Sequence, residues 1–156
     1  GEEGIAPLRY AFLGALVGSA ARVLFGPVAD RLGGGRVTVF SAVGIALSCA
    51  WTATQLSPES AADFPGFLWG MLAIFFFSGV GNASTFKQMP SIFDRRQAGG
   101  VIGWTSAVAA FGPFFFSVIL ASTPDVALFW FWTALSVVGT GLAWWYYARK
   151  GAEKPS

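Results

Sequence analysis

The residue best suited to chemistry in this chain is Arg22, which stands inside an apolar stretch of helical length, residues 8–28. It is the only charged residue deep in any of five such stretches. A charge at that depth costs roughly 2.5–3.5 kcal/mol on insertion-based scales, so it normally faces a cavity or a partner. The planar guanidinium fork fits two oxygens of a flat oxyanion. Arg22 therefore indicates anion binding, with pairing to an acidic side chain outside these stretches as the alternative.

Three glycines share a helix face with this arginine. Gly14, Gly18 and Gly26 are spaced at multiples of four residues from Arg22, which places all four residues on one side of a helix. Small residues allow a neighbouring helix or a ligand to approach the backbone closely. We therefore expect Arg22 to point into the protein rather than into lipid.

The composition places these residues in a membrane. The chain is 54% hydrophobic and only 12% charged, whereas soluble domains carry about 25% charged residues. Long charge-free windows predict an all-α integral membrane protein with five transmembrane helices, each near the ~20 residues that span a bilayer. The expected segments are residues 8–28, 37–56, 67–86, 101–121 and 126–147. Because the connections are short, neighbouring helices are expected to be antiparallel.

The distribution of basic residues predicts the orientation. Eight of the ten Lys and Arg residues fall on one alternating side of the five segments, whereas Glu59, Asp63 and Asp125 mark the other side. By the positive-inside rule the basic side is cytoplasmic. We expect a multi-pass protein of the inner (plasma) membrane with an outward N-terminus, which carries Glu2 and Glu3, and a cytoplasmic tail over residues 151–156.

Several classes of site are disfavoured by what the sequence lacks. It contains no histidine and one cysteine, Cys49, which excludes His-based metal sites, His bases and an intrachain disulfide. No basic run is long enough to suggest nucleic acid. We expect no cofactor, no metal and no enzymatic activity, because no carboxylate pair lies deep in the segments and Cys49 has no evident base.

Two further stretches carry small and polar residues. Near the end of the third segment, Asn82, Ser84 and Thr85 are predicted to line a polar mouth. Gly79 and Gly81 just before them permit close packing or local unwinding. In the fourth segment Gly99, Gly103 and Ala107 form a second small-residue stripe, and Pro113 predicts a kink. Simple helix packing is the alternative explanation for both stretches.

The turn after the first segment carries a charged, glycine-rich motif. Residues 26–36 fit G-x-x-x-D-R-x-G-x-x-R, with Asp30, Arg31 and Arg36 at its charged positions. This resembles the loop between the second and third helices of each half in the major facilitator superfamily. The resemblance implies that Asp30, Arg31 and Arg36 act at a cytoplasmic gate. An ordinary polar turn with topogenic arginines is the alternative.

The chain as a whole resembles the NarK-type nitrate/nitrite porters of that superfamily. The resemblance is carried by residues 18–22, 29–34, 79–86 and 98–104. It implies a partial C-terminal six-helix half over residues 1–150, which corresponds to helices eight to twelve. The N-terminal half is expected from the same polypeptide.

The resemblance also implies a substrate site for nitrate and nitrite. Arg22 matches the arginine that the C-terminal half contributes to the anion. Residues 103–112 match a glycine-rich stretch, although Ala109 and Pro113 stand where glycines are expected. The implied substrate-binding residues are Arg22, Gly103, Thr105, Ser106, Ala109 and Gly112.

The mode of transport can be argued in part from the residues. No Asp, Glu or His lies in the segments, where Arg22 is the only charged residue at depth, whereas proton symport normally uses a titratable group near the site. The resemblance implies alternating access for nitrate and nitrite, and the lack of such a group favours nitrate/nitrite antiport over proton-coupled uptake. A transporter of another small anion, or a membrane module that transports nothing, remains the alternative.

Overall fold

The computed structural model describes residues 7–56 and 61–152, and everything regular in these ranges is helical. The long helices are α1 (Ala11–Leu32), α2 (Gly34–Thr54), α3 (Phe64–Ile92), α4 (Arg95–Ala110), α5 (Gly112–Ser122) and α6 (Asp125–Ala143). Short 3₁₀ turns, η1 (Pro7–Tyr10) and η2 (Ala61–Asp63), precede α1 and α3, and the π-helical η3 (Trp144–Ala148) continues α6. Glu2, Glu3, Glu59 and the tail from residue 153 onward lie outside the described residues.

Five helical stretches are long and apolar enough to cross a membrane. They are Ala11–Leu32, Gly34–Thr54, Phe64–Ile92, Arg95–Ile119 and Asp125–Ala148. The prediction of an all-α integral membrane protein with five transmembrane helices is thereby confirmed. The third helix is longer than predicted, with 29 residues, so residues 79–90 lie inside a continuous helix without local unwinding.

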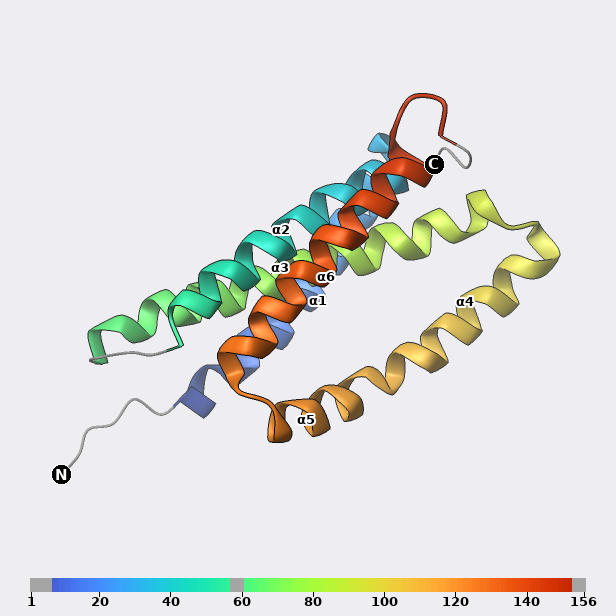
Figure 1. Ribbon diagram of the computed structural model, residues 1–156. Helices are drawn as coiled ribbons and strands as arrows, with labels where there is room; N and C mark the ends of the chain where they lie inside the picture. The colour runs from blue at the N-terminus through green and yellow to red at the C-terminus, as the bar shows by residue number, and fades with distance from the viewer. Residues whose placement is uncertain (1–6, 57–60, 153–156) are drawn as a thin grey trace.

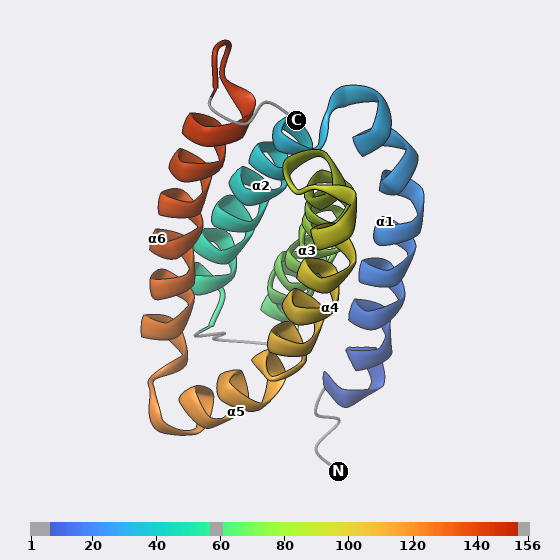
Figure 2. The ribbon, with the colours of Figure 1, turned by 90° about the vertical axis from the view of Figure 1, so that its right-hand side faces the viewer.

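Four of the helices pack side by side in the order α6, α2, α3, α1 (Figure 2). Helix α3 lies between α1 and α2, and α6 covers the other side of α2. Small side chains make the centre of this packing: Ala21 and Ala29 from α1, Val37 from α2 and Val80 from α3 are buried together. Small residues suit this core because the hydrophobic effect does not drive helices together in lipid. Small side chains instead let the helix backbones approach closely and make van der Waals contact.

Helices α4 and α5 stand apart from these four (Figure 1). The fourth membrane stretch is interrupted at Phe111, whose N–H donates to the Val108 carbonyl at 3.1 Å. Pro113 lies in the first turn of α5, where its missing N–H and fixed φ are tolerated. Regular α-helix is thus interrupted two residues before Pro113, where a kink was predicted. One contact that ties α5 to α6 is the Phe116 ring, whose centroid is 6.2 Å from that of Trp132.

The turn between α1 and α2 is much tighter than predicted, since the expected segments left residues 29–36 between the two helices. Asp30 and Arg31 belong to the last turn of α1, and Arg36 to the first turn of α2. Gly33 alone lies between the helices, with φ 91°, and its N–H donates to the Ala29 carbonyl at 3.1 Å. Glycine adopts that φ without a steric cost, so one residue suffices to reverse the chain.

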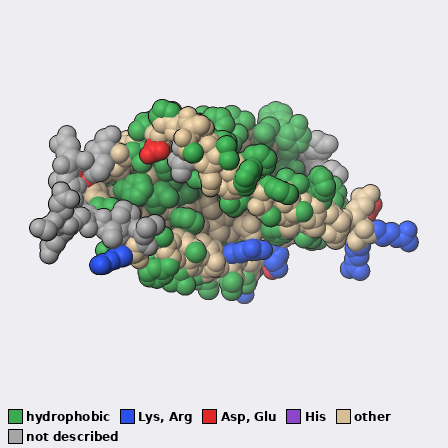
Figure 3. All heavy atoms as spheres, turned by 90° about the horizontal axis from the view of Figure 1, so that it is seen from below, with side chains coloured by type: hydrophobic (Ala, Val, Ile, Leu, Met, Phe, Trp, Pro, Cys, Tyr) green, Lys and Arg blue, Asp and Glu red, His purple; other side chains and the backbone are tan. Residues whose placement is uncertain are grey.

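The outer surface is apolar. Large hydrophobic side chains such as Val23, Trp69 and Trp104 are at least 70% exposed, and hydrophobic atoms are spread over much of the face in Figure 3. A soluble protein rarely exposes such an extended apolar area. Contact with lipid explains it.

Candidate functional site

The glycines of α1 bring its backbone into contact with α3. A Cβ atom added to Gly79 of α3 would collide with the carbonyl oxygen of Gly18, and one added to Gly18 would lie 3.2 Å from the carbonyl oxygen of Phe75. Gly14 is covered by the Phe75 ring. The prediction that the glycine face of α1 allows close approach of a neighbouring helix is confirmed.

Arg22 lies at the middle of this helix. It has eleven residues of α1 before it and ten after it, which is the middle of a membrane-length helix. Its Cζ lies 5.4 Å from the centroid of the Phe86 ring on α3, within the range of a cation–π interaction. Arg22 is exposed in the described part of the chain, which does not meet the expectation that it points into the protein.

Arg22 has no acidic partner among residues 7–56 and 61–152, where the one ion pair joins Lys87 to Asp30. The same part of the chain provides no hydrogen-bond acceptor for its guanidinium. Arg22 is thus positioned by packing on Phe86 while its N–H donors remain available. Such an arrangement can bind an anion, because charge-assisted bonds to a planar oxyanion can use the whole fork.

The three residues of the predicted polar mouth lie on different sides of α3. Asn82 is exposed and stands four residues before Phe86, so it shares the face that carries the ring below Arg22. Thr85 is half-buried and donates to the Gly81 carbonyl at 2.8 Å. Ser84 is fully buried toward α2, with its Oγ 2.9 Å from Thr38 Oγ1. Of the three residues, Asn82 is therefore the one that lies on the same face of α3 as Phe86, the residue that contacts Arg22.

A small polar cluster between α2 and α3 was not predicted. Thr38 Oγ1 donates to Gln88 Oε1 at 3.4 Å and also contacts Ser84, and Gln88 is buried. These contacts link α2 to α3 in a low-dielectric setting. A sequence signal was available and was not used: Thr38, Ser41 and Ser48 recur at spacings of three and seven residues, which places their hydroxyl groups on one face of α2.

The charged turn contacts the end of α3. Lys87 Nζ donates to Asp30 Oδ2 at 2.8 Å, and the two side chains are 49% and 53% exposed. Lys87 is one of the eight basic residues used above to predict the orientation, and its pairing with Asp30 was not predicted. Opposite charges at the same end of neighbouring helices were the available signal. Arg31 and Arg36 are exposed beside the pair and line a cleft with residues 147–151.

The residues predicted on the fourth segment are not brought into contact with Arg22. Cβ atoms added to Gly103 or Gly112 would meet nothing within 4 Å. Ser106 and Ala109 are exposed, and Thr105 is half-buried. The most apolar window of the stretch Arg95–Ile119 contains no buried residue in the described part of the chain.

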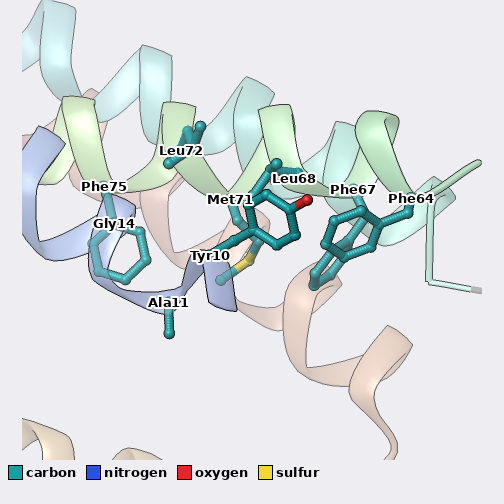
Figure 4. A pocket seen from close by; sticks show the side chains of 9 residues that line it. All are labelled: Tyr10, Ala11, Gly14, Phe64, Phe67, Leu68, Met71, Leu72 and Phe75. Carbon is teal, nitrogen blue, oxygen red and sulfur yellow. The ribbon is translucent and has the colours of Figure 1, made fainter. Parts of the chain in front are cut away.

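A separate pocket between the starts of α1 and α3 has a different character (Figure 4). It has a volume of about 310 Å³ and is lined by Tyr10, Ala11, Gly14, Phe64, Phe67, Leu68, Met71, Leu72 and Phe75. The Tyr10 hydroxyl is the single polar side-chain group of this lining. The pocket therefore offers no charge to bind an anion.

The fold and the site define a polytopic helical membrane protein with an arginine at the middle of a membrane helix. No family model matches the chain. It is 59% identical over 154 residues to a probable nitrate/nitrite antiporter, NarK2, of Thermus thermophilus, covering 96% of this chain and 35% of the relative. It is 27% identical over 170 residues to the nitrate/nitrite transporter NarU of Escherichia coli K12, covering 92% of this chain and 37% of the relative.

The NarU protein of Salmonella typhimurium is 30% identical over 129 residues, covering 69% of this chain and 28% of the relative. The chain belongs to the NarK-type nitrate/nitrite porter family of the major facilitator superfamily. It spans about a third of the length of the curated relatives that it matches.

Proposed function

We propose that the full-length protein exchanges nitrate and nitrite across the inner (plasma) membrane by alternating access, and that Arg22 binds the anion. The observation that carries this proposal is the placement of Arg22 at the middle of α1 without an acidic partner in the described part of the chain. The names of the relatives, nitrate/nitrite antiporter and nitrate/nitrite transporter, support the choice of substrate.

The chemistry of the site follows from the guanidinium and its neighbours. Nitrate is planar, and two of its oxygens match the donor fork of Arg22. Phe86 holds the guanidinium by a cation–π contact, which preserves the positive charge while it restricts the side chain. Asn82, on the same face of α3 as Phe86, provides a neutral donor at the edge of the site. Ser84 is engaged with α2, so we do not include it in the site.

Helices α4 and α5 are proposed to supply the opposing wall. Gly103 and Gly112 leave the backbone accessible, and Thr105, Ser106 and Ala109 occupy the same stretch. A further part of the polypeptide, the N-terminal half, would contribute the rest of the cavity and a second positive charge. Such a midplane site between two bundles is the general arrangement for alternating access.

The gate is proposed at the end of the bundle where α1 meets α2. Asp30 on α1 and Lys87 on α3 form an ion pair there, and Arg31 and Arg36 lie beside it. We place this end, together with the C-terminus, in the cytoplasm because it gathers most of the basic residues. Opening and closing of this end would make or break charge contacts with the other half.

Exchange is proposed rather than proton-coupled uptake. The described membrane helices contain no carboxylate deep in the bilayer, and an arginine side chain in a protein does not release its proton. Antiport of two monovalent anions needs no proton site, because each anion replaces the other in the same positive cavity.

The proposal is tested by counterflow in proteoliposomes that contain the full-length protein. Vesicles loaded with nitrite should take up external nitrate, and vesicles loaded with chloride or acetate should not. Uptake of nitrate that does not depend on internal nitrite would contradict antiport and would indicate uniport or symport instead. If the protein transports another small anion but neither nitrate nor nitrite, the proposed substrates are wrong.

A further inference from the structure

We propose that a basic cleft at the α1–α2 turn binds the phosphate of an anionic phospholipid, whose acyl chain lies in an adjoining apolar groove. The cleft has a volume of about 490 Å³ and lies between the turn and the segment after α6. Its charged lining residues are Asp30, Arg31, Arg36, Arg149 and Lys150. The proposal rests on the membrane location of the helices and is independent of which anion is transported.

The charge of the cleft favours a phosphate. Four of its five charged side chains are cationic, and the single acid, Asp30, is already paired with Lys87 at 2.8 Å. Arginine and lysine together suit a phosphate, since the arginine fork binds two oxygens and the ammonium acts as a point charge. Basic pockets at the ends of transmembrane helices bind lipid headgroups for this reason.

One of these cations is held at the level of the membrane boundary. Arg149 Nε donates to the Trp145 carbonyl at 2.8 Å, and its Cζ lies 4.0 Å from the centroid of the Trp145 ring. Trp144 and Trp145 are about half exposed, as expected for aromatic residues at the interface between lipid and water. The terminal nitrogens of Arg149 are thus presented where phospholipid headgroups lie.

The apolar groove supplies the reason to choose a lipid over a free phosphate ion. It has a volume of about 360 Å³ and is lined by Phe25, Val28, Leu32, Arg36, Val37 and Phe40. Leu32 and Arg36 line both the groove and the basic cleft. A charged headgroup site therefore runs directly into a hydrophobic channel between α1 and α2. Leu32 and Phe40 are more than half exposed, so a chain can enter this channel from the bilayer.

The test uses native mass spectrometry of the full-length protein in detergent. Dioleoylphosphatidylglycerol should remain bound where dioleoylphosphatidylcholine is lost. The Arg36→Gln and Arg149→Gln variants should each weaken binding of phosphatidylglycerol about fivefold, the effect of one basic residue at a membrane surface. Arg95→Gln is the matched control, because Arg95 is exposed near the same end of α3 but outside the cleft, and it should bind like wild type.

A groove variant separates lipid from phosphate. Phe40→Ala should weaken retention of phosphatidylglycerol and leave any binding of inorganic phosphate unchanged. Equal retention of both lipids, or wild-type binding by the Arg149→Gln variant, would overturn the proposal. Inorganic phosphate that displaces the lipid, with no effect of Phe40→Ala, would reduce the cleft to a simple anion site and would overturn the lipid assignment. Size-exclusion profiles identify any variant that fails to fold.

Discussion

The α1–α3 interface and the α4–α5 helices both carry small residues at a spacing of four, yet they use them in opposite ways. At the interface, Gly18 and Gly79 are so close to the neighbouring backbone that neither has room for a side chain without movement. On α4, Gly99 and Gly103 face open space, with nothing within 4 Å of an added Cβ. The same spacing can therefore serve helix packing in one place and leave a backbone surface uncovered in another.

The difference suggests that the two regions have different roles. The packed region fixes the backbone of α1 and thereby the position of Arg22. The uncovered face of α4 and α5 is free to meet substrate or a further part of the transporter, as proposed above. Substitutions that add bulk to each region can break or sharpen this comparison.

The largest effect is expected from Gly79→Val. Its side chain would press on the Gly18 carbonyl, a backbone atom that cannot rotate away. We expect a loss of stability at the upper end of the about 1–3 kcal/mol that overpacking costs. Thermal unfolding of the full-length protein in detergent measures it.

Gly103→Val is the matched control for that substitution. It should unfold within a few degrees of wild type, while its exchange of nitrate for nitrite should fall, because the added isopropyl group narrows the proposed site. An equal loss of stability in both variants would show that α4 is packed as tightly as α3, and the comparison would fail.

A smaller effect is expected from Ser84→Ala in the packed region. This change removes the contact between Ser84 and Thr38, 2.9 Å apart, and a bond to the Gly81 carbonyl. Interhelical hydrogen bonds in membranes average about 0.6 kcal/mol in double-mutant cycles. A cycle with Thr38→Val should give a coupling energy of that size. A coupling of zero would mean that α2 and α3 are joined by apolar packing alone.

The smallest effect on stability is expected from the Asp30–Lys87 pair. Both side chains are about half exposed, and exposed pairs contribute about 0–1 kcal/mol. Asp30→Asn should leave the unfolding temperature almost unchanged but alter the exchange rate if the pair acts in the gate. The double variant Asp30→Lys with Lys87→Asp should restore the rate. An unchanged rate in Asp30→Asn would remove this pair from the gating mechanism.

Much of the fold could be predicted from the sequence because bilayer thickness fixes the helix length. Five apolar windows gave five membrane-length helices, and Pro113 marked the interruption of the fourth. The extent of the turn was wrong. Asp30 and Arg36 looked like loop residues because they are charged, whereas charged residues readily occupy helix ends that reach water, and Gly33 alone makes the turn.

The candidate site was less accessible to sequence reasoning. Arg22 could be singled out because a charge in an apolar helix is rare. Its contact with Phe86, and the burial of Ser84 toward α2, depend on how α3 is rotated between two neighbours. The sequence of α3 has polar residues on several faces and carries no strong periodic signal for that rotation, so only the packing shows which neighbour each residue contacts.

The central claim is that Arg22 binds the anion through its planar fork, and Arg22→Lys tests it most directly. Counterflow of nitrate against nitrite should be measured for the full-length wild type, for Arg22→Lys and for Arg95→Lys as control. Lysine keeps the charge and loses the fork. Since a hydrogen bond to a charged group contributes about 1.5–3 kcal/mol, Arg22→Lys should fold normally and exchange about ten- to hundredfold more slowly, with Arg95→Lys unaffected. Exchange at the wild-type rate by folded Arg22→Lys would contradict the claim, and Arg22 would then have a structural role.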